Sequence, residues 1–184
     1  MRRVIRAFIV VFVGYLCQVC IMPHFAVGSI TPNLLFPLIA IITVAYGRFY
    51  SFGAASVSGI FMEAMTSGVP LINLIGYTAI GLMGSLIFAD KSERKLEQER
   101  SAGKPGTNAN PYLRSILCTL FYIAWYEAIH MLFIYLNGAS LGWVQYGRAL
   151  GSVVYTVALC ALFMVPVRWI LGMYAKKTKM QAAG

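Results

Sequence analysis

The chain of 184 residues has a composition that a water-soluble domain cannot accommodate. Apolar residues make up 59% of it and charged residues 11%, whereas soluble domains average roughly 45–50% and about 25%. A globular interior of this size cannot bury so many apolar side chains, so the composition predicts an integral membrane protein. The net charge of +9 does not indicate a nucleic-acid-binding protein, because the basic residues lie in short clusters between apolar runs.

Six apolar segments predict an all-α fold of six transmembrane helices, with no separate soluble domain. The first segment follows a basic start and resembles the apolar core of a signal peptide. No small-x-small cleavage site follows it, so we interpret it as a retained membrane helix. Turns rich in Gly, Pro, Ser and Thr separate several of the segments. The expected helices cover about residues 5–22, 33–46, 49–65, 69–89, 113–136 and 148–171.

A hydrophilic stretch, residues 90–111, separates the fourth helix from the fifth. Its first half, DKSERKLEQER, alternates in charge sign and predicts an extension of the fourth helix into water. Its second half, SAGKPGTNANP, is typical of a loop. The tail, residues 173–184, is basic, and we expect it to be a frayed cytoplasmic segment.

The positions of Lys and Arg predict that both termini are cytoplasmic, because basic residues concentrate on that side of a membrane. Of the 15 Lys and Arg residues, Arg148 alone then falls on the outer side, at the start of the sixth helix. The inner residues are Arg2, Arg3, Arg6, Arg48, Lys91, Arg94, Lys95, Arg100, Lys104, Arg114, Arg168, Lys176, Lys177 and Lys179.

Few polar side chains fall inside the apolar segments, and each needs a physical reason because a charge in the bilayer is costly. The charged or titratable ones are Glu63, Glu127, His130 and Arg148. A helical rise of about 1.5 Å per residue places both glutamates in the outer half of the membrane. Other polar groups at a similar depth are Gln18, His24, Asn33, Asn73 and Asn137. This gradient predicts either an outward-opening pocket or docking surface, or groups that satisfy one another between helices.

Glu127 and His130 are three residues apart and share a helix face. An E-x-x-H pair can bind metal, but di-iron sites require two such pairs and further carboxylates. Cys17 and Cys20 have C-x-x-C spacing without the second pair that a zinc site needs. We therefore expect no metal or cofactor, and a hydrogen-bonded Glu127–His130 pair with Arg148 as a candidate counter-ion. No catalytic set of residues is recognisable, so the sequence predicts no enzymatic activity.

Small residues repeat every fourth position in the third and fourth helices. The stripe in the third helix consists of Ser51, Ala55 and Gly59 and ends at Glu63, and the fourth helix carries Gly81 and Ser85 in a similar stripe. Small residues let helix backbones approach closely in lipid. We expect these two helices to pack along the stripes, and an external docking face is the alternative.

Three runs together resemble the rod shape-determining MreD family: TPNLLFPLIAI (31–41), SGIFMEAMTSGVPL (58–71) and LIGYTAIGLMGSLIF (74–88). Glu63 stands where that family usually has an aspartate. The resemblance implies a non-catalytic subunit of the bacterial elongation machinery in the cytoplasmic membrane. It also implies association with the bitopic protein MreC and, through it, with a SEDS polymerase, a penicillin-binding transpeptidase and the cytoskeletal protein MreB.

The family's fold is similar to that of the S components, the substrate-binding subunits of energy-coupling-factor vitamin transporters. This similarity supplies an alternative function, the capture of a vitamin in an outward-facing pocket. The first helix lacks the Ala-rich stripe through which S components dock on their partner. A third class, a small membrane enzyme acting on lipid-linked substrates, is disfavoured by the scarcity of acids and histidines.

Overall fold

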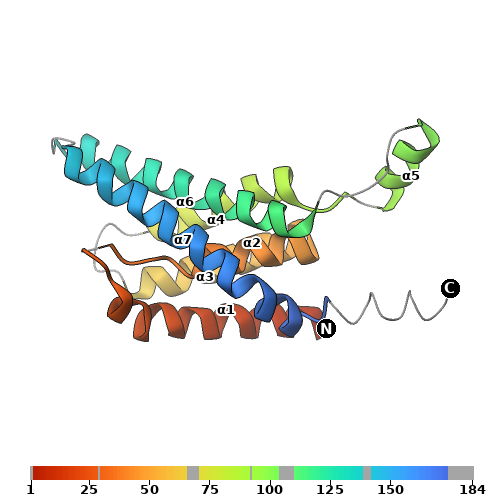
Figure 1. Ribbon diagram of the computed structural model, residues 1–184, viewed down its shortest axis with the longest axis horizontal. Helices are drawn as coiled ribbons and strands as arrows, with labels where there is room; N and C mark the ends of the chain where they lie inside the picture. The colour runs from red at the N-terminus through yellow and green to blue at the C-terminus, as the bar shows by residue number, and fades with distance from the viewer. Residues whose placement is uncertain are drawn as a thin grey trace.

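The computed structural model describes residues 2–28, 30–65, 71–91, 93–103, 110–138 and 142–173, with backbone alone for 93–95. This part of the chain is all-helical, as its composition and apolar runs predicted (Figure 1). The helices are α1 (Arg2–Cys20), η1 (Met22–Phe25), α2 (Leu35–Tyr46), α3 (Arg48–Met65), α4 (Ile72–Phe88), α5 (Glu93–Ser101), α6 (Pro111–Leu136) and α7 (Trp143–Ile170).

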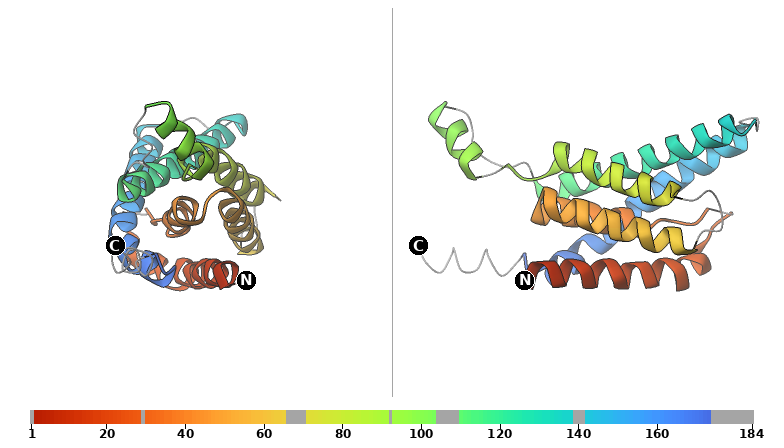
Figure 2. Two further views of the ribbon diagram at one scale, coloured as in Figure 1. Left: turned by 90° about the vertical axis from the view of Figure 1, so that its right-hand side faces the viewer. Right: turned by 180° about the vertical axis from the view of Figure 1, so that it is seen from behind.

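Helix α2 lies at the centre of the bundle and is surrounded by α1, α3, α4, α6 and α7 (Figure 2). Its sequence, LFPLIAIITVAY, is apolar on every side, which is typical of a helix buried all round. Every residue from Leu35 to Val44 is buried. With 12 residues it is only about 18 Å long, and its neighbours shield it from lipid.

Three helices, α1, α6 and α7, are long and apolar enough to cross a membrane, which indicates a membrane protein. Helices α2 and α4 are shorter apolar helices. Large apolar side chains are exposed along α1, α6 and α7, as expected of surfaces that face lipid.

The bundle has two ends of different character (Figures 1 and 2). The start of α1, the start of α6 and the end of α7 lie at one end, which we call the basic end. Its basic residues are Arg2, Arg3, Arg6, Arg48, Arg114 and Arg168. The end of α6 and the start of α7 lie at the other, which we call the polar end because Glu127, His130 and Arg148 belong to it.

The hydrophilic stretch does not continue α4, and this expectation was wrong. Helix α4 ends at Phe88, the backbone of Ala89 is extended, and a separate helix, α5, begins at Glu93. The guanidinium of Arg114 donates hydrogen bonds to the Phe88 carbonyl and to the Asp90 carboxylate. Because these bonds tie the end of α4 to the first turn of α6, the chain turns away there.

Some helix boundaries also differ from the sequence prediction. Helix α7 begins at Trp143, so Arg148 lies inside the helix and not at its start. The Gly142 N–H donates to the Gln145 side chain at 2.9 Å, which stabilises this earlier start. The expected turn at residues 66–70 and most of the basic tail, residues 174–184, lie outside the described residues.

Candidate functional site

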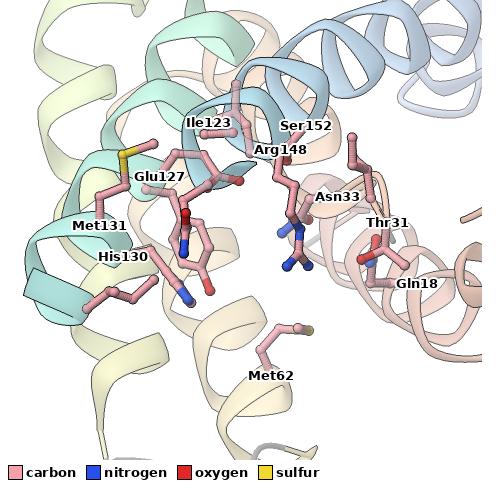
Figure 3. A pocket seen from close by; sticks show the side chains of 15 residues that line it. Gln18, Thr31, Asn33, Met62, Ile123, Glu127, His130, Met131, Arg148 and Ser152 are labelled. Atoms are coloured by element: carbon pink, nitrogen blue, oxygen red, sulfur yellow. The ribbon is translucent and has the colours of Figure 1, made fainter. Parts of the chain in front are cut away.

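A pocket of about 370 Å³ opens at the polar end between α1, α3, α6, α7 and the segment that leads into α2 (Figure 3). Its polar lining residues are Gln18, Thr31, Asn33, Tyr126, Glu127, His130, Gln145, Arg148 and Ser152. Apolar side chains, among them Met62, Ile123 and Met131, complete the wall. A pocket of this size with a few convergent polar groups is typical of a site for a small ligand.

The pocket brings together three of the five residues of the predicted polar cluster. Glu127 and His130 project from α6 on one side, and Arg148 reaches in from α7 (Figure 3). Glu127 is half-buried, whereas His130 and Arg148 are exposed. The site thus presents a carboxylate, a guanidinium and an imidazole around one opening. It can bind a molecule that carries both charge and hydrogen-bonding groups.

Two amides of the pocket wall hold the chain that enters α2. The Gln18 amide donates to the Pro32 carbonyl at 3.2 Å and accepts from the Leu34 N–H at 2.6 Å. The Asn33 side chain accepts from the Leu35 N–H at 3.0 Å and donates to the Tyr77 hydroxyl at 2.7 Å. These amides were recognised in the sequence only by their depth, and the structure shows that they fix the pocket wall.

Glu63 lies outside the pocket and binds the N-terminus of α4. Its carboxylate accepts from the Leu71 N–H at 2.6 Å and from the Asn73 N–H at 3.0 Å. The first backbone N–H groups of a helix have no partner within the helix, and its dipole favours an anion there. Of the polar residues grouped with Glu63 by their depth, Asn73 donates to it through its backbone amide, and the described contacts of Glu63 include neither Arg148 nor His130.

Asn73 connects this cap to the pocket. Its side-chain oxygen accepts from the Tyr126 hydroxyl at 3.0 Å, and the Tyr126 ring lines the pocket. The same ring packs against Phe36 and Tyr77, with ring centres 5.1 and 5.7 Å away. Glu63 and Asn73 therefore support the pocket from behind and do not line it.

The small-residue stripes of α3 and α4 face one another. A Cβ atom built on Gly59 lies 2.9 Å from the Leu74 Cα atom, and one built on Gly81 collides with the Ala55 side chain. The Ser51 hydroxyl donates to the Gly81 carbonyl at 3.0 Å. Ser85 of α4 is also buried, and its hydroxyl donates to the Leu82 carbonyl of the same helix. The stripes thus form a packing surface between α3 and α4. They do not form the external docking face that was the alternative.

A buried hydroxyl network near the centre of the bundle was not anticipated. The Thr43 hydroxyl lies 2.7 Å from the Ser51 hydroxyl and 2.9 Å from the Tyr122 hydroxyl. This network links α2, α3 and α6, and all three side chains are buried. One sign of this network was present in the sequence, Thr43. Apart from Tyr46 at the end of the helix, Thr43 is the single hydroxyl residue in the otherwise apolar α2.

No protein-family model, curated protein or solved structure matches the chain. The surfaces and cavities of the structure are therefore the basis for proposing a function. Among the described residues, no group of three or more His, Cys, Asp or Glu side chains is placed to hold a metal ion. What the site offers is charge and hydrogen bonding in a preformed cavity.

Proposed function

We propose that this chain is a non-catalytic membrane subunit of the bacterial cell-elongation machinery, similar to the MreD family. In this proposal it spans the cytoplasmic membrane six times, with both termini inside. It binds the membrane helix of an MreC-like bitopic protein and thereby a SEDS polymerase and a penicillin-binding transpeptidase. The resembling runs support this proposal because they correspond to α2, the second half of α3 and α4, which form the packed centre of the bundle.

The observation that carries the proposal is an apolar groove between α1 and α3 on the outside of the bundle. It has a volume of about 160 Å³ and is lined by Val4, Ala7, Phe8, Val11, Phe49, Tyr50, Gly53, Ala54 and Val57. A Cβ atom built on Gly53 meets nothing within 4 Å, so the groove has a notch at this position. In lipid, helices associate where a small residue lets two backbones approach. A single partner helix fits such a notch.

Gly53→Leu tests the docking surface. A Cβ atom here meets nothing within 4 Å, so we expect the leucine side chain to occupy the notch, with normal abundance and loss of co-purification of the MreC-like partner. Overpacking a helix contact typically costs about 1–3 kcal/mol, which is roughly a fivefold to 150-fold loss of affinity. The matched control is Gly147→Leu, because Gly147 lies in α7, away from the groove, and also has open space at its Cβ.

Affinity purification of the tagged variants, with the partner quantified by immunoblot, measures this effect. A Gly53→Leu protein that retains the partner at the wild-type level contradicts docking in the groove. Loss of the partner with Gly147→Leu as well would show that the effect is not specific to α1 and α3.

The proposed orientation is tested by labelling single cysteines in a variant that lacks the four native ones. Cysteines at Gly103 and Ala182 are expected to react with an impermeant maleimide only after the inner face is opened. A cysteine at Asn137, between α6 and α7, is expected to react in intact cells. The basis is that all Lys and Arg residues except Arg148 fall in segments on one side. Labelling of Gly103 or Ala182 positions in intact cells would reverse the assignment.

The pocket at the polar end favours a second candidate, an S component that captures a small molecule. In that reading the cavity holds the substrate, with Arg148, His130 and Glu127 as its polar contacts. The genes next to this one discriminate the two functions. A bitopic coiled-coil protein and a penicillin-binding protein support the elongation subunit, whereas a pair of ATPases supports the transporter.

A further inference from the structure

Arg168, in the last turn of α7, has a buried guanidinium whose donors are incompletely used. The residue is 8% exposed, and its buried Nε and Nη1 atoms have no hydrogen-bond partner. Buried charges in proteins are paired or hydrogen-bonded, because desolvating an unpaired charge is costly. Arg168 therefore requires an acceptor that the described part of the chain does not supply.

The side chains around Arg168 place it near a lipid headgroup region. Its guanidinium carbon lies 4.9 Å from the centre of the Tyr112 ring, in cation–π geometry. Tyr112, in the first turn of α6, is 37% exposed, and Trp169, next to Arg168, is 73% exposed. Tyr and Trp are enriched where the hydrocarbon meets the headgroups. An anion that reaches Arg168 along this surface comes from the membrane interface.

The described charges at the basic end favour the binding of an anion. Asp90, the acidic residue that follows α4, pairs with Arg114. Arg6 donates to the Leu171 carbonyl at 3.5 Å and adds positive charge near the end of α7. A guanidinium presents parallel N–H donors in a fixed plane, and this geometry matches the oxygens of a phosphate.

We propose that Arg168 and Tyr112 form a binding site for the phosphate of an acidic phospholipid in the leaflet at the basic end. In this proposal the Tyr112 ring, which lies over the guanidinium, moves aside when the lipid binds, and Nε and Nη1 donate to two phosphate oxygens. The acyl chains then lie along an exposed apolar stripe of α7 formed by Leu162, Val165 and Trp169. Free phosphate shares the headgroup chemistry but does not use this stripe, which favours the lipid. The inference depends on the membrane assignment and not on the elongation-complex proposal.

The test uses the full-length protein in nanodiscs of phosphatidylcholine, with and without phosphatidylglycerol, and native mass spectrometry of bound lipid. Phosphatidylglycerol is expected to bind the wild-type protein and raise its Tm. Arg168→Met is expected to lower the bound fraction about tenfold or more, because it removes two charge-assisted hydrogen bonds. In phosphatidylcholine alone its Tm is expected to equal or exceed that of the wild type, since the unpaired charge is gone. Arg48→Met, which removes an exposed charge at the same end, controls for general electrostatic attraction.

Several results would overturn the proposal. Equal binding of phosphatidylglycerol to the wild type and Arg168→Met would mean that Arg168 does not hold the headgroup. A lower Tm of Arg168→Met in both lipids would reduce Arg168 to a structural contact with Tyr112. A full Tm shift with inorganic phosphate alone would assign the site to a free anion. No preference of the wild type for phosphatidylglycerol would leave an acidic segment of a partner protein as the acceptor.

Discussion

Gly59→Leu is expected to cause the largest loss of Tm and of abundance. A Cβ atom at this position lies 2.9 Å from the Leu74 Cα atom and 3.2 Å from the Asn73 carbonyl oxygen. Both are backbone atoms, so no side-chain rotation relieves the collision, and α3 and α4 must move apart. Overpacking typically costs about 1–3 kcal/mol, and a contact against backbone lies at the upper end of that range. This is a large share of the roughly 5–15 kcal/mol that stabilises a typical protein.

Size-exclusion chromatography of a fluorescent fusion in detergent, followed by thermal unfolding, measures the loss. Gly53→Leu is the matched control, because it places the same side chain on the same helix at a position where a Cβ atom meets nothing within 4 Å. The expected pattern is a monodisperse Gly53→Leu protein and an aggregated or absent Gly59→Leu protein. Equal abundance and equal Tm for the two variants would mean that Gly59 is not at a close contact between α3 and α4.

Glu63→Leu is expected to have the second largest effect, because it removes both acceptors from the N-terminus of α4. Hydrogen bonds to a charged group are worth about 1.5–3 kcal/mol each, and this variant removes two of them. Leu71, which donates one of them, has a left-handed backbone with φ 69°, a conformation that costs a non-glycine residue about 1–2 kcal/mol. The bond from the Leu71 N–H to the carboxylate helps to hold this residue in that conformation.

Glu63→Gln separates hydrogen bonding from charge. The glutamine oxygen retains one acceptor, so the variant is expected to lie between the wild type and Glu63→Leu in Tm and abundance. Thermal unfolding of the purified variants gives the order, and partner co-purification is measured in parallel. If both variants accumulate normally and fail only in partner binding, the carboxylate serves recognition, and the cap is not its main role. If both match the wild type in every assay, Glu63 has no role.

Glu63 also illustrates how packing and the pocket are connected. Its carboxylate fixes the start of α4, the Asn73 side chain on that turn accepts from the Tyr126 hydroxyl, and the Tyr126 ring forms part of the pocket wall. A change at Glu63 therefore alters the shape of the pocket without touching its lining.

The sequence by itself determined the class of the molecule and the elements that build it. Apolar runs must leave water, so they predicted an all-helical membrane protein, and three of the observed helices are long and apolar enough to cross a membrane. Small residues at every fourth position predicted the α3–α4 contact. Both signals depend on local composition and on the helical period, which the chain carries in each segment. The break after Phe88 escaped prediction because it depends on Arg114, which is distant in sequence and binds both sides of the break.

Only the tertiary structure decided which polar groups meet. Depth along a helix grouped Glu63 with Glu127, His130 and Arg148, yet rotation about the helix axis places Glu63 against α4 and the others around the pocket. The direction in which a helix faces depends on the packing of all its neighbours, which no single segment encodes. For the same reason, the sequence did not predict that Arg168 has buried donors without partners. In sequence, a basic residue near a helix end is read as a sign of the cytoplasmic side of the membrane.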